Sequence, residues 1–444
     1  MTVNKTVVET SKRKLHNSFF KWRHQPFVLL FFYMLFITCW EDLSGIGTLL
    51  SHLDEVLFLV LFLYLICNYH FLSTKKIHFL WLWSLFWMTG FLSTCIHRYQ
   101  PLVPSMVDGV IITNKFVVGY LSSVVFCKKH DVAEILRMIN LLSKLITIVL
   151  FALSVHDAFL SPIFPIDYHS KSIGFLFTQR LFFYHPTYLA FAGVTLLLVI
   201  SFHSKYSEDV PYKLMLTFLI FVTFRAKAIG FIFIYWLLLV YFFMVKQRKI
   251  LYIVIPALLG IIVLAKDKIV TYFMISTRFS PRNILLKDSI MLAKNHFPFG
   301  TGFGTFASNI SARYYSSLYY GLGYDQLRGM GLNGDTSFLS DSFWPCIIGQ
   351  FGFLGLALFV VIVFRLLQTA IGKLKRDKNT GFVMLMALAY LLITSVAETS
   401  FFNPAAFLIA ILFGAFEMKK VPRHSFVTCV YQNEGKTEYL VRVN

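Results

Sequence analysis

Residues 343–365 read FWPCIIGQFGFLGLALFVVIVFR and carry no charged side chain before Arg365. An α-helix rises about 1.5 Å per residue, so about 20 apolar residues cross the ~30 Å hydrocarbon core of a bilayer. A helix also satisfies its backbone polar groups internally, which lipid cannot do. The stretch therefore predicts a membrane-spanning helix.

Similar stretches recur along the whole chain. Of the 444 residues, 57% are hydrophobic and only 14% are charged, against about 25% charged in a soluble domain. Lipid must therefore cover much of the surface. The predicted fold class is an all-α polytopic membrane protein with about 12 transmembrane helices, at residues 26–41, 53–72, 77–96, 103–126, 139–156, 181–202, 211–225, 228–245, 250–266, 344–368, 381–397 and 404–418.

The basic residues that give the chain its net charge of +19 lie mostly in loops between the predicted spans. Lys and Arg collect between alternate spans, as the positive-inside rule requires, and this places both termini in the cytoplasm. Arg225 and Lys227 divide the run 211–245 into two spans and keep that alternation. The aromatic residues lie within apolar runs, so nucleic acid is excluded as a partner, while membrane lipid is expected to be one.

The same pattern sets the domain organisation. We expect a basic cytoplasmic tail at 1–25, nine helices within 26–266, a large extracytoplasmic loop at 267–343, three helices within 344–418 and a cytoplasmic tail at 419–444. The periodicity of residues 284–293 predicts a short amphipathic helix in the loop. The turn at 298–305 (PFGTGFGT) fits two interpretations: a flexible re-entry point, or a set of backbone amides that approach an anion.

Basic side chains that this topology places on the outer side are candidates for holding a pyrophosphate. Guanidinium groups bind phosphate oxygens in pairs, and Arg278 and Arg282 would share a face if both were helical. Each cation could instead anchor a lipid headgroup or balance a nearby carboxylate. The candidates are Arg180, Arg225, Lys227, Arg278 and Arg282.

Outer-side acids and one histidine are candidates for general acid or base chemistry. The catalytic candidates are Asp341, Glu398 and His185, and Asp335, Glu41 and Asp42 are further carboxylates on that side. A carboxylate at the membrane edge also has a structural explanation, and His185 could bond to a carbonyl that Pro186 frees.

Two charges fall inside a predicted span. Asp108 and Lys115 lie about two helical turns apart, and could pair with each other or with Lys144, or serve a function. The six cysteines show neither a CxxC pair nor a metal-ligand spacing, so we expect no metal site and no cofactor.

Four stretches together resemble a known family. They are QRLFFYHPTY at 179–188, TFRAKAIG at 223–230, RFSPR at 278–282 with FPFGTGFGTF at 297–306, and SDSFWPCIIGQFGFLG at 340–355. In this order they resemble the Wzy-type polysaccharide polymerases and the related O-antigen ligases of bacteria.

The resemblance implies a GT-C-like, metal-independent glycosyltransferase in the bacterial cell membrane, using undecaprenyl-pyrophosphate-linked glycans at the outer leaflet. Arg180, Arg225, Arg278 and Arg282 would hold the leaving pyrophosphate, and Asp341 or His185 would act as base. The resemblance also allows a chain-length regulator and a flippase as protein partners. Ligases carry a His in the outer loop, where this chain has only His296. A ligase and a lipid-linked oligosaccharide transporter remain alternatives.

Overall fold

The computed structural model describes residues 25–39, 52–160, 163–164, 172–173, 176–203, 208–244, 280–331 and 336–419. Apolar helices make up most of this part. They are α2 (Gln25–Leu35), α4 (Leu53–Asn68), α5 (Thr74–His97), α6 (Leu102–Met106), α7 (Lys115–Lys129), α8 (Ala133–Phe159), α9 (Pro186–His203), α10 (Val210–Phe221), α11 (Ala226–Leu239), α16 (Phe343–Leu374), α17 (Lys378–Thr394) and α18 (Pro404–Met418).

Short elements extend or connect these helices. The list is η2 (Ile37–Cys39), η3 (Tyr69–Phe71), the π-helical segments η4 (Val107–Ile112) and η5 (Val240–Met244), α13 (Pro281–Asn295), α14 (Asn309–Arg313), α15 (Ser317–Gly321), η8 (Tyr324–Gln326), η9 (Ser337–Ser340) and η10 (Ser400–Phe402). Within the described ranges the only sheet is an antiparallel pair, β1 (Ser172–Ile173) with β2 (Leu176–Phe177), in which Ser172 faces Phe177.

Seven of the described helices are long and apolar enough to cross a membrane: α4 with η3, α5, α6 through α7, α8, α9, α11 into η5, and α16. Four shorter apolar helices accompany them, namely α2, α10, α17 and α18. The expected class, an all-α membrane protein, is therefore confirmed. The predicted span at 250–266 lies outside the described residues, so the count of twelve stays a prediction.

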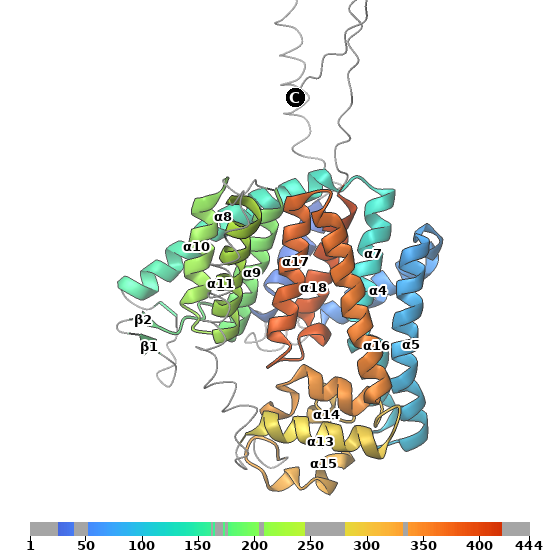
Figure 1. The fold of residues 1–444 in the computed structure, drawn as a ribbon. Coiled ribbons are helices and arrows are strands. Elements are labelled where there is room, and N and C mark those ends of the chain that lie inside the picture. Colours follow the sequence, from blue (N-terminus) through green and yellow to red (C-terminus); the bar gives the residue numbers. More distant parts are fainter. Residues whose placement is uncertain are drawn as a thin grey trace, which may run out of the picture.

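The helices run side by side, and part of the predicted loop covers one end of the bundle. Helices α13, α14 and α15 lie beyond that end, with α13 crosswise to α16 (Figure 1). The amphipathic helix predicted at 284–293 is thus found within α13, which packs against α16. We call this end the loop end. The opposite end, where Lys128, Arg376 and Lys419 lie, is called the basic end.

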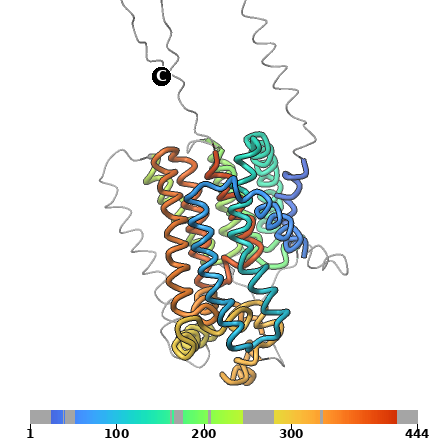
Figure 2. Tube along the Cα trace, turned by 90° about the vertical axis from the view of Figure 1, so that its right-hand side faces the viewer, coloured from blue at the N-terminus to red at the C-terminus, as the bar shows by residue number. Residues whose placement is uncertain are grey.

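Helix α16 is bent where the loop meets it. Gly352 has φ 69° and ψ −170° inside α16, a conformation that side chains other than glycine rarely adopt. A Cβ atom there would collide with the carbonyl oxygen of Pro298. The bend frees two carbonyls of α16, and the Thr301 and Gly302 amides donate to Gly349 O and Gln350 O, each at 2.9 Å. Glycine at 352 therefore permits the loop to attach to α16; α5 lies alongside α16 (Figure 2).

The Gly-rich turn is anchored firmly, so it is not the flexible re-entry point that one interpretation of the sequence expects. The Phe303 amide donates to Thr94 Oγ1 at 2.8 Å, and the Gly304 amide donates to Asp108 Oδ2 at 2.8 Å and Gln350 Oε1 at 3.1 Å. The amides from residue 301 to 304 are all used within the protein. Only the Gly304 amide approaches a carboxyl group, that of the buried Asp108, so the other interpretation, backbone amides at an anionic group, applies to this one amide and to a group of the protein itself. The turn is an anchor between the loop and the bundle.

Lys115 does not pair with Asp108, the partner named for it from the sequence. Its Nζ lies 2.5 Å from Oδ2 of Asp54 on α4, and both side chains are at most 5% exposed. Lys144 instead pairs with Asp209 at 2.7 Å. The π-helical η4 and the break at Asn114 interrupt the helix between Asp108 and Lys115. The regular seven-residue spacing therefore does not put the two side chains on one face.

Candidate functional site

The candidate site residues that the structure describes lie on turns at the loop end. Each residue lies in a turn beside a helix or in the first turn of a helix, and these helices come from distant parts of the chain (Figure 1). The residues are Arg180 and His185 before α9, Arg225 and Lys227 at the start of α11, Arg282 at the start of α13, Asp341 before α16 and Glu398 after α17.

Arg225 sits in a strained turn between α10 and α11. It is the N-cap of α11, and Phe224 before it has φ 48°, in the left-handed region. A non-glycine residue there costs of order 1–3 kcal/mol, and such strain clusters at functional sites. The Gln179 amide donates to Val222 O at 3.0 Å, so the turn before α9 lies beside this one. Leu181 in that turn also has a positive φ, 49°.

Arg225 and His185 meet across these two turns. Arg225 Nη2 lies 2.9 Å from His185 Nε2. A guanidinium has no acceptor atom, so Nε2 must accept and the imidazole is neutral. The Thr187 amide also approaches Nδ1, at 3.3 Å, but a neutral imidazole has one acceptor and the shorter contact is to Arg225. In this contact Arg225 engages the Nε2 lone pair that a general base would use, so His185 can take up a proton there only when Arg225 turns to another partner.

Lys227 and Glu398 form the second pair. The Lys227 ammonium bonds to Glu398 Oε1 and to the carbonyl oxygen of Ala397, the latter at 3.3 Å. The two side chains are 24% and 26% exposed. This pair ties the start of α11 to the end of α17.

Arg282 and Asp341 form the third pair, at the junction of loop and bundle. Arg282 Nη2 lies 3.0 Å from Asp341 Oδ2, and the side chains are 22% and 36% exposed. Both charges act on Lys227 through space. Lys227, Glu398, Arg282 and Asp341 therefore form one group, which we call the loop-end cluster.

Arg180 has a different environment. Its Nη1 donates to the carbonyl oxygen of Tyr184 at 3.0 Å, so the guanidinium closes its own turn. Arg278, Asp335, Glu41 and Asp42 lie outside the described residues. Helix α13 begins at Pro281, after Ser280 in an extended conformation. His296, the only loop histidine, accepts or donates a bond with Tyr99 Oη at 2.8 Å.

The arrangement suits an anion with several oxygens. Lys227 and Arg282 each pair with a carboxylate, whereas the Arg225 guanidinium contacts the His185 ring, so the three cations outnumber the two acids by one. Ion pairing holds the long cationic side chains of Arg282 and Lys227 in place, so these charges are preorganised. Within the described ranges no three His, Cys, Asp or Glu side chains gather in a way that would hold a metal ion.

Sequence reasoning missed the residues that support this site. It proposed Lys227 and Glu398 separately but not their pairing, and it did not single out Gln350. That side chain is fully buried, and its Nε2 donates to Phe306 O at 2.7 Å. The sequence does hold a signal for Gln350, because it is the one amide side chain in the apolar run of residues 343–364. A polar group buried in such a run needs hydrogen-bond partners.

Comparison with known proteins gives no relative: no protein-family model matches the chain, and no curated protein matches it.

Proposed function

We propose that this chain is a membrane glycosyltransferase that joins undecaprenyl-pyrophosphate-linked oligosaccharide repeats into a surface polysaccharide. The observation that carries the proposal is the loop-end cluster, in which the ion pairs Arg282–Asp341 and Lys227–Glu398 come from separate turns and lie within electrostatic reach of each other. The Arg225–His185 pair at the start of α11 adds a further cation and a neutral imidazole.

The proposed reaction assigns a task to each group. A hydroxyl oxygen of the acceptor repeat attacks the anomeric carbon of the donor chain, and the bond from that carbon to the pyrophosphate oxygen breaks. The electron pair leaves with the pyrophosphate, whose developing charge Arg225, Arg282 and Lys227 stabilise. The hydroxyl proton passes to a base, for which His185 and Asp341 are the candidates.

Asp341 and Glu398 have a second task in this proposal. Without substrate they neutralise Arg282 and Lys227 and keep both side chains at the junction of loop and bundle. A pyrophosphate carries more charge than either carboxylate, so it can take over these cations when it binds. The released carboxylate of Asp341 is then available to accept a proton.

The proposal places the protein in the bacterial cell membrane with the loop end outward. Donor and acceptor would then reach the site from the outer leaflet, and the basic end, with Lys128 and Arg376, would face the cytoplasm. The donor carries its own activated bond, so the reaction calls for neither a nucleotide sugar nor a metal ion.

The test is the glycolipid profile of a strain that lacks this gene, with and without a plasmid copy. A polymerase predicts single lipid-linked repeats that accumulate and polymer that returns on complementation. Accumulated finished chains would identify a ligase instead. An unchanged profile, or repeats that stay on the cytoplasmic leaflet as a transporter defect requires, would overturn the assignment.

A further inference from the structure

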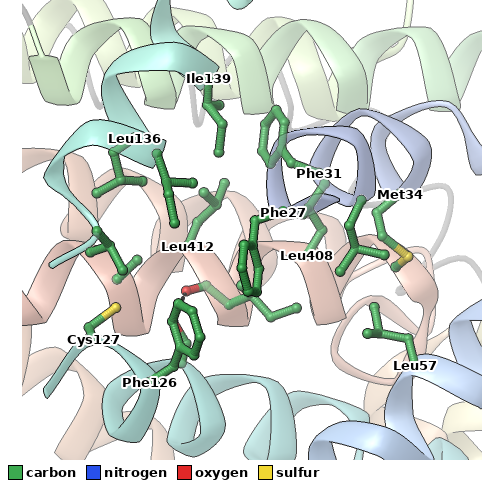
Figure 3. Close-up of a pocket in the computed structure, with 16 residues that line it drawn as sticks. Phe27, Phe31, Met34, Leu57, Phe126, Cys127, Leu136, Ile139, Leu408 and Leu412 are labelled. Carbon is green, nitrogen blue, oxygen red and sulfur yellow. Dashed lines mark hydrogen bonds between the residues drawn. The ribbon is translucent and has the colours of Figure 1, made fainter. Parts of the chain in front are cut away.

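A groove of about 130 Å³ lies far from the loop-end cluster, between α2, α7, α8 and α18 (Figure 3). Phe126 and Cys127, near the end of α7, and Ala415, near the end of α18, are among its lining residues. These positions put the groove in the half of the bundle that adjoins the basic end. It has no part in the proposed transfer reaction.

The groove is elongated along the helix axes. The lining residues repeat at positions i, i+3, i+4 and i+7 from Phe27 to Met34 on α2, from Val132 to Ile139 on α8 and from Leu408 to Ala415 on α18. Such a stripe follows one face of a helix for about 10 Å. A channel of this shape fits a linear chain that runs parallel to the helices.

The lining gives water little to bind. Carbon atoms dominate it, and the hydroxyl of Ser123 already donates to Ile411 O at 2.7 Å. A buried water needs two to four polar partners, whereas apolar cavities of about 150 Å³ stay dry and take up apolar molecules. In a protein that spans a membrane, the abundant apolar molecule of linear shape is a lipid acyl chain.

Cations follow lining residues of the groove directly in the sequence. Lys128 and Lys129 follow Cys127 directly, and their ammonium groups bond to neutral acceptors, Phe71 O at 2.7 Å and Asn68 Oδ1 at 2.8 Å. Arg137 follows the lining residue Leu136 and is exposed. Three cations and the two acids Asp131 and Glu134 leave a positive balance there, which attracts anionic headgroups.

We infer that this groove binds one acyl chain of an anionic phospholipid, whose phosphate lies against Lys128 and Lys129. The acyl chain fills the space between α2 and α8, and the headgroup remains at the basic end. This lipid would complete the packing of α2, which contacts both α8 and α18.

The experiment measures phospholipid retained by the full-length protein, purified in mild detergent and then reconstituted with phosphatidylglycerol or phosphatidylcholine. Leu136→Trp fills the groove, while Leu145→Trp is the control on the same helix, where the side chain is 60% exposed. Retention of phosphatidylglycerol should fall about tenfold in Leu136→Trp, as expected when about two methylene groups lose their burial, and stay unchanged in Leu145→Trp.

A second measurement needs no substitution. Cys127 lines the groove, whereas Cys67 is exposed, so phosphatidylglycerol should slow maleimide labelling of Cys127 and leave Cys67 unaffected. The double variant with Lys128→Gln and Lys129→Gln tests the headgroup contact. It should remove the preference for phosphatidylglycerol over phosphatidylcholine. The inference fails if no phospholipid is retained, or if Cys127 labels equally fast with and without lipid. It also fails if the purified protein is a dimer that Leu136→Trp dissociates, because a second copy of the chain would then fill the groove.

Discussion

Arg282 at the start of α13 and Asp341 just before α16 form an ion pair, although 59 positions separate them in the sequence. Their contact closes the loop onto the end of the bundle. Because Lys227 lies within electrostatic reach of both, the pair also connects the loop to the turn that carries Arg225. Changes at Arg282 and Asp341 therefore test the proposed function most directly.

Arg282→Ala should reduce polymer formation by about a hundredfold to a thousandfold, the usual effect of removing one group that stabilises charge in a transition state. Arg282→Lys should keep part of the activity, since it keeps the charge but loses the paired geometry. The measurement is polymer formed from lipid-linked repeats by purified protein. Lys294→Ala, exposed at the other end of α13, is the matched control. Normal polymer in Arg282→Ala would remove this arginine from the site.

Asp341→Asn should lower polymer formation by about a hundredfold, as expected for loss of a general base, while the amount of protein in the membrane stays close to wild type. The amide still fits between Arg282 and the start of α16 but cannot accept a proton. Polymer and protein should be measured in the same membranes. Wild-type activity would show that Asp341 only neutralises Arg282, and His185 would remain as the candidate base.

Gly352→Ala should destabilise the protein, because the bend in α16 needs a positive φ and leaves no room for a Cβ atom beside Pro298. The positive-φ conformation, with ψ near 180°, alone costs about 1–3 kcal/mol for a residue other than glycine, and the collision adds to it. Gly372→Ala is the control, since it lies in the same helix with no atom near its Cβ position and should be neutral or stabilising. Thermal unfolding in detergent compares the two; equal midpoints would mean that the bend is not required.

Much of the fold could be read from the sequence because lipid exposure and helix length are local properties. The run at 343–364 carries no charge and Gln350 is its one amide side chain, and Arg225 with Lys227 marks the turn between α10 and α11. Residue types and topology also placed Arg282 and Asp341 at one end. Their pairing depends on which turns meet, and no local pattern records that. The bend at Gly352 and the contact between Gly304 and Asp108 follow from packing between distant segments, so they were out of reach.

The orientation of the bundle is open to chemical labelling. Tyr320 in α15 is 55% exposed at the loop end, and Lys375 is exposed at the basic end. In a cysteine-free background, Tyr320→Cys should react with an impermeant maleimide on intact cells, whereas Lys375→Cys should react only after permeabilisation. The reverse pattern would turn the loop end toward the cytoplasm and exclude transfer at the outer leaflet.

The loop should respond to pH through Asp288 of α13. Its Oδ2 accepts a hydrogen bond from Tyr324 Oη at 2.7 Å, and burial raises the pKa of this carboxyl above its ordinary value of 3.8, although the bond from Tyr324 opposes the change. The folded loop therefore holds this proton more tightly than the unfolded chain does. The resulting stabilisation is complete below the unfolded pKa and is lost as the pH rises through the folded pKa.

Asp288→Asn should remove this pH dependence, because the amide oxygen still accepts from Tyr324 and nothing titrates. Tyr324→Phe should enlarge it, since the carboxylate loses its donor and its pKa rises further. Hydrogen exchange of the α13 amides at about pH 4 and about pH 7 measures the effect. Protection in the wild type should be greater at the lower pH, Asp288→Asn should show little difference, and Tyr324→Phe should show the largest. Equal pH dependence in all three proteins would show that Asp288 titrates as it does in the unfolded chain.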